Sequence, residues 1–286
     1  MLTVSAPAKL NLTLEVLGRR PDGYHDIRSV IQSINLSDSL TLALSRELKF
    51  RSNVPDWTAE QSLVSRAARV LQETTACTRG AAIEVSKRIP LLSGLGGDSS
   101  DAAATLYGLN RLWELELPEE KLLVMAASLG SDVPFFLAGG TVLAEGRGEV
   151  LTPLPPMPRM WAVLVIPAVP RAPGKTKGMY HRLNTSHYSD GRITEKLVAV
   201  LRERTEFTPS LLFNTFENVA FTPRSEIKLF RDHLIKMGAD NVHLAGSGPA
   251  LFTLLKDKGP AEELVTRCRQ QGMETYLAET TTTNEH

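Results

Sequence analysis

The chain has little cysteine and no long apolar run. Its two cysteines, Cys77 and Cys268, lie far apart and outside C-x-x-C spacing, so neither a disulfide framework nor a zinc site is expected. No apolar stretch reaches the roughly 20 residues that a membrane-spanning helix needs, and no basic segment followed by an apolar run indicates a signal peptide. These absences predict a cytoplasmic protein with no membrane partner.

The chain also lacks an excess of charge of either sign. Lysine and arginine total 32, and aspartate and glutamate total 32, so the formal net charge is zero. A nucleic-acid-binding protein usually carries a basic patch or stripe, and we therefore expect no nucleic-acid partner. A phosphorylated ligand would have to be held by local groups. The 286 residues suffice for one large domain or two ordinary ones.

Strict alternation marks the clearest predicted strand, residues 8–16. Leucine and valine occupy one face, and Lys9, Asn11, Thr13 and Glu15 occupy the other, which predicts a half-buried strand with one polar face. Similar reasoning predicts further strands at 27–36, 39–44, 81–86, 141–145, 149–152, 161–166, 241–245, 250–255 and 274–278, and helices at 62–73, 99–113, 118–130, 193–204, 224–237 and 260–271.

A proline-rich segment divides the chain. Residues 151–159 contain four prolines and can continue neither a helix nor a central strand. We expect an N-terminal domain at 1–156 and a C-terminal domain at 157–286. The interleaving of helices with strands predicts an α+β sandwich of two layers.

A glycine-rich loop at 90–104 is the sharpest local feature. Gly94, Gly96 and Gly97 allow a backbone to approach a ligand closely. Small residues then begin a helix, whose first N–H groups lack internal partners and favour an anion. Loop and helix start together predict a phosphate site, formed by Pro90, Leu91, Leu92, Ser93, Gly94, Leu95, Gly96, Gly97, Asp98, Ser99 and Ser100.

Two other phosphate-binding patterns fail on spacing, and a simple strand-to-helix turn is the structural alternative. A dinucleotide fingerprint would need glycine where Ser99 stands. A Walker loop ends in Gly-Lys-Ser/Thr, which Gly174-Lys175-Thr176 supplies, but its first glycine is replaced by Val169. Three glycines in four positions favour phosphate binding over a turn that only makes room.

Three separated segments resemble the motifs of the GHMP kinase superfamily, which comprises galacto-, homoserine, mevalonate and phosphomevalonate kinases. They are P-A-K-L-N-L-T-L at 7–14, the glycine-rich loop, and A-G-S-G-P-A-L-F at 245–252. Within that superfamily, R-x-D-G-Y-H at 20–25 and G-x-D-V-P-F-F at 130–136 resemble the 4-diphosphocytidyl-2-C-methyl-D-erythritol kinases of the non-mevalonate isoprenoid pathway. The resemblance covers the whole chain and is densest before residue 150.

The resemblance implies a fold and a reaction. The fold has an N-terminal half like domain 2 of ribosomal protein S5 and a ferredoxin-like C-terminal half. In the reaction, ATP phosphorylates the 2-hydroxyl of a small-molecule substrate that carries a cytidine diphosphate group, with Mg²⁺ as the metal. Either Ser99 or Ser100 is the expected protein ligand of that metal. We expect a monomer or a weak homodimer.

The resemblance also implies roles, position by position. Lys9 and Asp132 match the two active-site residues, the lysine supplying positive charge and the aspartate accepting or orienting the hydroxyl proton. For the substrate, it implies Asn11 as a positioning residue, Tyr24 and His25 at the cytosine edge, Tyr180 as the stacking aromatic, and Gly246, Ser247 and Gly248 as a third motif that closes over the phosphates.

The chain departs from the family pattern at two positions. Asp98 replaces a loop glycine, and Ser62 replaces an asparagine near the adenine pocket. Because aspartate is a preferred N-cap, we expect Asp98 to cap the helix that follows, with Mg²⁺, Lys87 or Arg88 offsetting its charge when nucleotide binds.

Other functions remain open at this point. Another kinase of the superfamily would act on homoserine or mevalonate, which offer no base for Tyr24, His25 and Tyr180. A non-catalytic member that only binds a ligand would not need both Lys9 and Asp132. An RNA-binding role, suggested by the S5-like half, is disfavoured by zero net charge.

Overall fold

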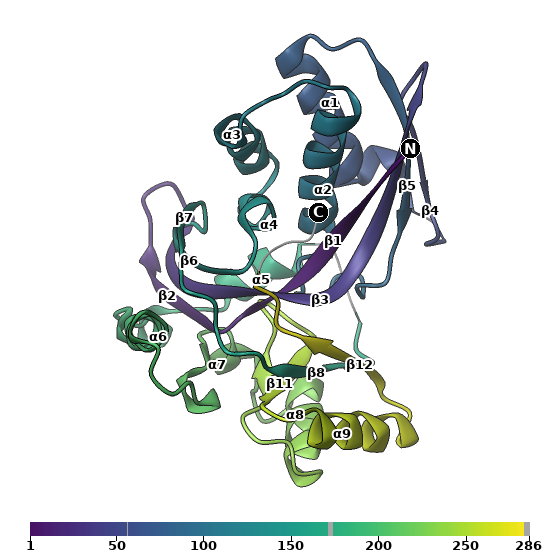
Figure 1. The fold of residues 1–286 in the computed structure, drawn as a ribbon. Helices are drawn as coiled ribbons and strands as arrows, with labels where there is room; N and C mark the ends of the chain where they lie inside the picture. The colour runs from purple at the N-terminus through teal and green to yellow at the C-terminus, as the bar shows by residue number, and fades with distance from the viewer. Residues whose placement is uncertain (56, 171–173, 283–286) are drawn as a thin grey trace.

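Strand β3, His25–Ser45, is the longest element, and the larger of two sheets is built around it. The computed structural model describes residues 1–55, 57–170 and 174–282 (Figure 1). β3 pairs antiparallel with β1, β2, β5 and β6. The sheet comprises β1 (Leu2–Asn11), β2 (Thr13–Arg19), β3, β4 (Lys49–Ser52), β5 (Gly80–Ser86), β6 (Thr141–Gly146), β7 (Val150–Pro153) and β9 (Phe213–Asn214).

Four helices cover one face of this sheet in the upper part of Figure 1. They are α1 (Leu63–Thr75), α2 (Gly97–Leu112), α3 (Glu119–Leu129) and α4 (Val133–Ala138). Helix α2 lies directly against β1, and three consecutive alanines, residues 102–104, are completely buried there. Small side chains let the helix approach the sheet closely, which fixes the position of its N-terminus beside β1.

The smaller sheet forms the lower part of the molecule and has the order β10–β11–β8–β12 (Figure 1). Along β8, Ala162, Leu164 and Ile166 pack toward the larger sheet, whereas Val163 and Val165 pack into a separate core with α9. Its elements and their neighbours are β8 (Trp161–Ile166), α5 (Lys175–His181), α6 (Arg192–Glu203), α7 (Glu217–Ala220), α8 (Glu226–Lys236), β10 (His243–Leu244), β11 (Leu251–Leu255), α9 (Lys258–Gln270) and β12 (Glu274–Glu279), with short 3₁₀ turns at Thr185–His187 and Pro209–Leu211. A further 3₁₀ turn, Ala59–Gln61, precedes α1.

A bulge in the pairing of β1 with β3 positions the polar end of β1. The pairing with β3 shifts between Pro7 and Ala8. Before the shift, Val4 and Ala6 pack into the helix-side core; after it, Ala8 and Leu10 pack into the core between the sheets. The shift skips two residues of β3, Asn35 and Leu36, and such an irregularity bends a strand, increases its local twist and re-aims its side chains. The bulge therefore turns Lys9 toward the side on which α2 begins.

The prediction of one half-buried strand over residues 8–16 is wrong in two respects. The chain bends at Leu12, which separates β1 from β2. The polar face is also buried, with Thr13 and Glu15 fully enclosed. Helix α6 explains this burial, because the Thr194 N–H donates to Glu15 Oε2 at 2.7 Å and the Thr194 hydroxyl donates to Thr13 Oγ1 at 2.9 Å. Polar contacts within the protein therefore take the place of the solvent contacts that the alternating pattern predicted for this face.

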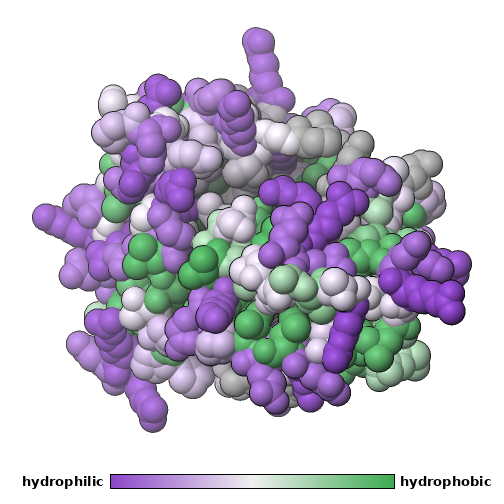
Figure 2. Space-filling model, turned by 90° about the horizontal axis from the view of Figure 1, so that it is seen from above, coloured by the Kyte–Doolittle hydropathy of each residue, from purple (hydrophilic) through white to green (hydrophobic). Residues whose placement is uncertain are grey.

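The two parts of the chain are joined at several points. β9 pairs parallel with β2, and a bridge links Ile34 with Thr280. The predicted α+β class is confirmed, whereas the division at residue 156 stays a prediction. On the face drawn in Figure 2, apolar residues lie in patches separated by hydrophilic side chains. Within the described ranges, no helix is both long enough and apolar enough to cross a membrane.

Candidate active site

A cavity of about 780 Å³ opens where β1, the glycine-rich loop, α5 and the 246–248 turn meet. Most of the predicted site residues line it. From the loop these are Pro90–Gly94 and Gly96–Ser99; from elsewhere they are Lys9, Asn11, Tyr24, His25, Asp132, Tyr180, Gly246, Ser247 and Gly248. Leu95 and Ser100 do not line the cavity. Leu95 packs in the core between the sheets, and Ser100 is fully buried in α2.

Lys9 lies at the centre of this arrangement. Its ammonium donates to Asn11 Oδ1 at 2.6 Å and lies 3.4 Å from Asp132 Oδ2. Asn11 Nδ2 in turn donates to Ser29 Oγ at 2.8 Å, which fixes the amide. The Lys9 backbone N–H donates to the Leu95 carbonyl at 2.9 Å, so the strand holds the loop directly.

Asp132 is the residue before helix α4, but its side chain makes no capping hydrogen bond. The carboxylate is 44% exposed and lines the cavity, whereas the Lys9 side chain is only 5% exposed. A buried ammonium therefore faces a carboxylate that ligands can reach. This arrangement can neutralise negative charge on a ligand and accept or orient a proton beside it.

The glycine loop is shaped by close protein contacts. A Cβ on Gly94 would lie 2.1 Å from the Ala245 carbonyl oxygen, and one on Gly96 would lie 2.6 Å from the Phe136 ring. Both glycines have positive φ, of 91° and 79°, which other residues rarely adopt. The Ala250 N–H also donates to the Ser93 carbonyl at 3.0 Å. The loop and the 245–250 segment thus form one unit.

Asn214, which the sequence analysis missed, supports this unit from below. Its buried amide donates at 2.8 Å to the carbonyls of both Leu244 and Gly246. Its Oδ1 accepts from the Phe216 N–H. One side chain on β9 thereby anchors the third motif, and only the tertiary pairing of β9 with β2 brings it there.

The Asp98 cap prediction is wrong. Helix α2 begins two residues earlier than predicted, and Gly96 is its N-cap. Asp98 lies inside the first turn, and its carboxylate lies 3.4 Å from the Lys87 ammonium. Gly96 has a left-handed backbone conformation, and the helix begins directly after it without a capping hydrogen bond from a side chain. Of the two cations proposed to offset Asp98, Lys87 is the one placed beside it.

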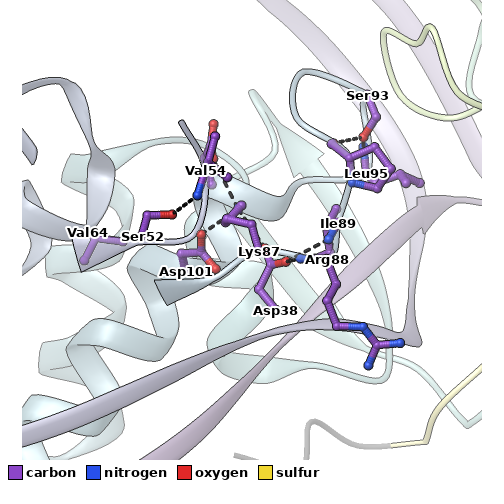
Figure 3. Close-up of polar contacts among 12 residues, drawn as sticks. Asp38, Ser52, Val54, Val64, Lys87, Arg88, Ile89, Ser93, Leu95 and Asp101 are labelled. Atoms are coloured by element: carbon purple, nitrogen blue, oxygen red, sulfur yellow. Dashed lines mark hydrogen bonds and ion pairs between the residues drawn. The ribbon is translucent and has the colours of Figure 1, made fainter. Parts of the chain in front are cut away.

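Lys87 belongs to a buried ionic cluster beneath the loop, shown in Figure 3. Its ammonium lies 2.6 Å from Asp101 Oδ2 and 2.7 Å from Asp38 Oδ2. Asp38 Oδ1 accepts the backbone N–H groups of Arg88 and Ile89, at 2.5 and 2.7 Å. Because Asp38 is on β3 and Asp101 is on α2, the cluster fastens both ends of the glycine loop.

The cluster contains three carboxylates and one ammonium. Burial, together with the charges of Asp38 and Asp98, raises the pKa of Asp101 to about 8, although Lys87 opposes this. The neighbouring carboxylates raise the pKa of Lys87 against the effect of its burial. Burial thus favours the protonated form of Asp101, while the carboxylates favour the charged form of Lys87.

Aromatic side chains line the other end of the cavity. The His25 and Tyr180 rings are stacked, with centroids 4.8 Å apart and planes inclined by 19°. Burial, with Arg19 and His181 adding to it, lowers the pKa of His25, which favours the neutral imidazole. A neutral imidazole can both donate and accept. The Arg147 guanidinium lies 4.8 Å from the centre of the exposed Tyr24 ring.

Tyr180 connects this aromatic end with Asp132. Burial and then the Asp132 charge raise the pKa of the Tyr180 phenol, so the carboxylate acts on that end of the cavity as well as on Lys9. Ser62, in contrast, caps α1 by accepting the Val64 N–H and does not line the cavity. Among described residues, no group of three or more histidine, cysteine, aspartate or glutamate side chains could hold a metal ion.

Family models match both parts of the chain. The GHMP kinases N terminal domain matches residues 62–140, and the GHMP kinases C terminal domain matches residues 196–273. A homoserine kinase from Cytophaga hutchinsonii has the same fold, with a TM-score of 0.67 at 19% identity over 99% of this chain and 95% of its own. Fold and site together define a small-molecule kinase of the GHMP class.

More similar relatives narrow this class. A 4-diphosphocytidyl-2-C-methyl-D-erythritol kinase from Dehalococcoides mccartyi is 48% identical over 98% of each chain. The crystal structure of a 4-(cytidine 5'-diphospho)-2C-methyl-D-erythritol kinase superposes with a TM-score of 0.83 at 32% identity, covering 98% of this chain and 99% of that one. The chain belongs to the 4-diphosphocytidyl-2-C-methyl-D-erythritol kinase family.

Proposed function

We propose that the chain transfers the γ-phosphoryl group of ATP to the 2-hydroxyl of 4-diphosphocytidyl-2-C-methyl-D-erythritol, releasing ADP and the 2-phosphate. The observation that carries this proposal is the Lys9–Asp132 pair, 3.4 Å apart, in a cavity bounded by the glycine loop and by Tyr24, His25 and Tyr180. The names of relatives at up to 48% identity support the substrate. This places the chain in the non-mevalonate route to isoprenoids.

Phosphoryl transfer depends mainly on positioning and charge stabilisation. The Lys9 ammonium, held by Asn11 on one side, supplies positive charge where the transferring oxygens would lie. Asp132 would accept the proton of the attacking hydroxyl, or orient it, because its carboxylate lines the cavity and makes no capping bond. The transferred group would rest against the glycine loop, which the Lys9 backbone contacts.

The aromatic end of the cavity would recognise the cytosine. His25, kept neutral by its lowered pKa, can both donate to and accept from the edge of a base. Tyr180, whose ring is stacked with His25 and lines the cavity, would stack on the same base. Tyr24 lies at the more exposed margin, where it would cover the bound base.

The residues at the loop fit a magnesium ion that is held mostly by the nucleotide. Mg²⁺ keeps several waters and usually binds through few protein groups together with phosphates. Ser99 lines the cavity, and the buried Ser100 hydroxyl makes no hydrogen bond with any described residue. One of these hydroxyls would serve as the protein ligand. The bound ion would neutralise charge on the β- and γ-phosphates.

A competition among acceptors tests the proposal. The protein is incubated with ATP, Mg²⁺ and, separately, the cytidylylated methylerythritol, homoserine or mevalonate, and ADP release is followed. Release with the first acceptor alone is expected. Release with homoserine or mevalonate would instead favour another GHMP kinase activity, and nucleotide binding without release would favour a non-catalytic member. Cytoplasmic location and a monomeric or weakly dimeric state remain expectations for fractionation and sedimentation experiments.

A further inference from the structure

The segment Gly174-Lys175-Thr176 ends like a Walker loop but lacks that loop's first glycine. In the fold it begins α5, a helix of seven residues, and lines the same cavity as the glycine loop. A phosphate-binding motif of the Walker kind is therefore not formed. Lys175 nevertheless lines the cavity. It comes from α5, whereas Lys9 comes from β1.

Two observations place Lys175 beside the 246–248 turn. The Thr176 and Ser247 hydroxyls are 2.9 Å apart, which ties α5 to the turn. The Lys175 ammonium lies 3.3 Å from the position that a Cβ on Gly248 would occupy, and the Lys9 ammonium lies 3.4 Å from the corresponding position on Gly246. Two ammonium groups from separate elements thus approach the two glycines of one turn.

The charges around the cavity give this second ammonium a purpose. Of the other lysines that line the cavity, Lys87 is surrounded by three carboxylates and Lys9 lies beside Asp132, while Lys177 lies two residues further along α5. A kinase of the proposed specificity must hold a triphosphate and a diphosphate near each other. Negatively charged phosphate groups that are held near each other repel strongly outside bulk water. Further positive charge is therefore needed beside them.

We propose that Lys175 is a phosphate-binding residue whose ammonium donates a charge-assisted hydrogen bond to a phosphate oxygen of a ligand in this cavity. The identity of the ligand rests on the proposed function. Either the acceptor's diphosphate or the ATP phosphates supply the oxygen. Helix α5 also carries Tyr180, five residues further on, which corresponds to about 7.5 Å along a helix. One helix therefore presents an ammonium and a base-stacking ring to the cavity.

Binding measurements without turnover test the assignment. Lys175→Met is titrated calorimetrically with CDP, with cytidine, and with a non-hydrolysable ATP analogue in Mg²⁺. Loss of a charge-assisted hydrogen bond is expected to weaken the affinity for at least one phosphorylated ligand about tenfold or more, while the affinity for cytidine stays the same. Weaker CDP binding assigns Lys175 to the acceptor side, and weaker analogue binding assigns it to the donor side.

Controls separate a phosphate contact from general effects. Lys175→Arg keeps the charge and should retain most of the affinity. Lys196→Met removes an exposed lysine of α6 that does not line the cavity and should change nothing. Raising the salt concentration should weaken CDP or analogue binding more in the wild type than in Lys175→Met. Should Lys175→Met prove unstable, the Lys175→Gln variant replaces it.

Two outcomes would overturn the assignment: affinities for both phosphorylated ligands within about twofold of the wild type, or an equal loss of affinity for cytidine. Failure of the proposed function looks different. In that case, the wild type would release no ADP with the cytidylylated acceptor, although the binding arms would still report on Lys175.

Discussion

Two buried lysines flank the glycine loop, and their surroundings differ. The side chains of Lys9 and Lys87 are 5% and 4% exposed. Lys9 faces a neutral amide and one carboxylate that opens on the cavity. Lys87 contacts two buried carboxylates and a third that is exposed. Burial alone therefore does not identify a catalytic lysine; what matters is whether its partners have already neutralised its charge.

The largest expected effect is a loss of stability, and it distinguishes Lys87 from Lys9. Lys87→Met leaves Asp38 and Asp101 buried without their cation. Breaking a buried pair by removing one partner costs about 3–5 kcal/mol, so the melting temperature should fall by roughly 10 °C or more. Differential scanning calorimetry measures this change. Arg88→Met, which removes the exposed neighbouring cation, is the matched control; an equally small shift in both variants would contradict the structural role of Lys87.

The second effect concerns turnover. Lys9→Met and Asp132→Asn should each lower kcat by about a hundredfold or more, the range of a lost electrostatic or proton-transfer contribution. Steady-state ADP release measures this effect. Because the Asp132 carboxylate is partly exposed, the melting temperature of Asp132→Asn should change little. Asp257 is a matched control, since it also precedes a helix without a side-chain cap bond but does not line the cavity. Near-normal kcat in Asp132→Asn would remove this residue from the mechanism.

A third effect lies at the aromatic end, away from both lysines. Stacking of a base on an aromatic ring contributes about 1–3 kcal/mol, so Tyr180→Ala should raise KM for the acceptor about five- to a hundredfold and leave KM for ATP near normal. Tyr180→Phe should be mild. Tyr188→Ala is the control, because Tyr188 contacts the edge of His25 without lining the cavity. A change in the ATP KM instead would place Tyr180 in the donor pocket.

The fourth effect is a pH dependence of stability. The pKa of Asp101 rises from its ordinary 3.8 to about 8 on folding, so the folded chain keeps a proton that the unfolded chain loses. This contribution to the free energy of unfolding is complete below about pH 4 and disappears as the pH rises through about 8. Raising the pH from 5 to 8.5 should therefore destabilise the wild type relative to Asp101→Asn, by about 2 °C or more.

Melting temperatures of both proteins across that range measure the difference. Lys87 does not interfere in this window, because its own raised pKa affects stability only above the ordinary lysine range. A difference between wild type and Asp101→Asn that is constant with pH would mean that Asp101 is already ionised at pH 5.

The smallest effect concerns the exposed member of the Lys87 cluster. Asp98 is 59% exposed and lies in the first turn of α2 beside the expected phosphates. Asp98→Asn should lower the Mg²⁺ concentration needed for half-maximal activity about two- to fivefold, because one charge–charge interaction at an exposed site is worth about 0.2–1 kcal/mol. Stability should change little. A higher Mg²⁺ requirement would indicate instead that Asp98 helps to bind the metal.

The sequence predicted those parts of the molecule that depend on local pattern. Most helices and strands, the α+β class and the glycine loop follow from periodicity and turn residues. The bend at Leu12 and the continuity of β3 were missed, because pairing across the sheet decided them rather than local preference. Motif resemblance named Lys9 and Asp132, but their 3.4 Å separation depends on the bulge at Pro7, which no spacing rule reveals.

Other contributors depended wholly on tertiary contacts. Asn214 anchors the third motif from a strand of only two residues. Asp38 is 50 residues or more from the backbone groups that it accepts. Lys175 follows the second glycine of an incomplete Walker pattern, a pattern that belongs to a different fold and gives this lysine no role here. The Gly-Lys-Thr sequence at 174–176 drew attention to Lys175. No comparable motif in the sequence indicated a role for Asn214 or Asp38.

The close fit of Gly94 against Ala245 also limits how such a protein can be recombined. A chimera joined near residue 157 would combine one relative's glycine loop with another's 245–250 segment. At Gly94 a side chain would meet the Ala245 carbonyl at 2.1 Å, so the freedom to substitute this position is set by backbone contributed from the far end of the chain. Chimeras of distant relatives should therefore fold only when both segments come from the same parent, whatever the overall sequence identity between the parents.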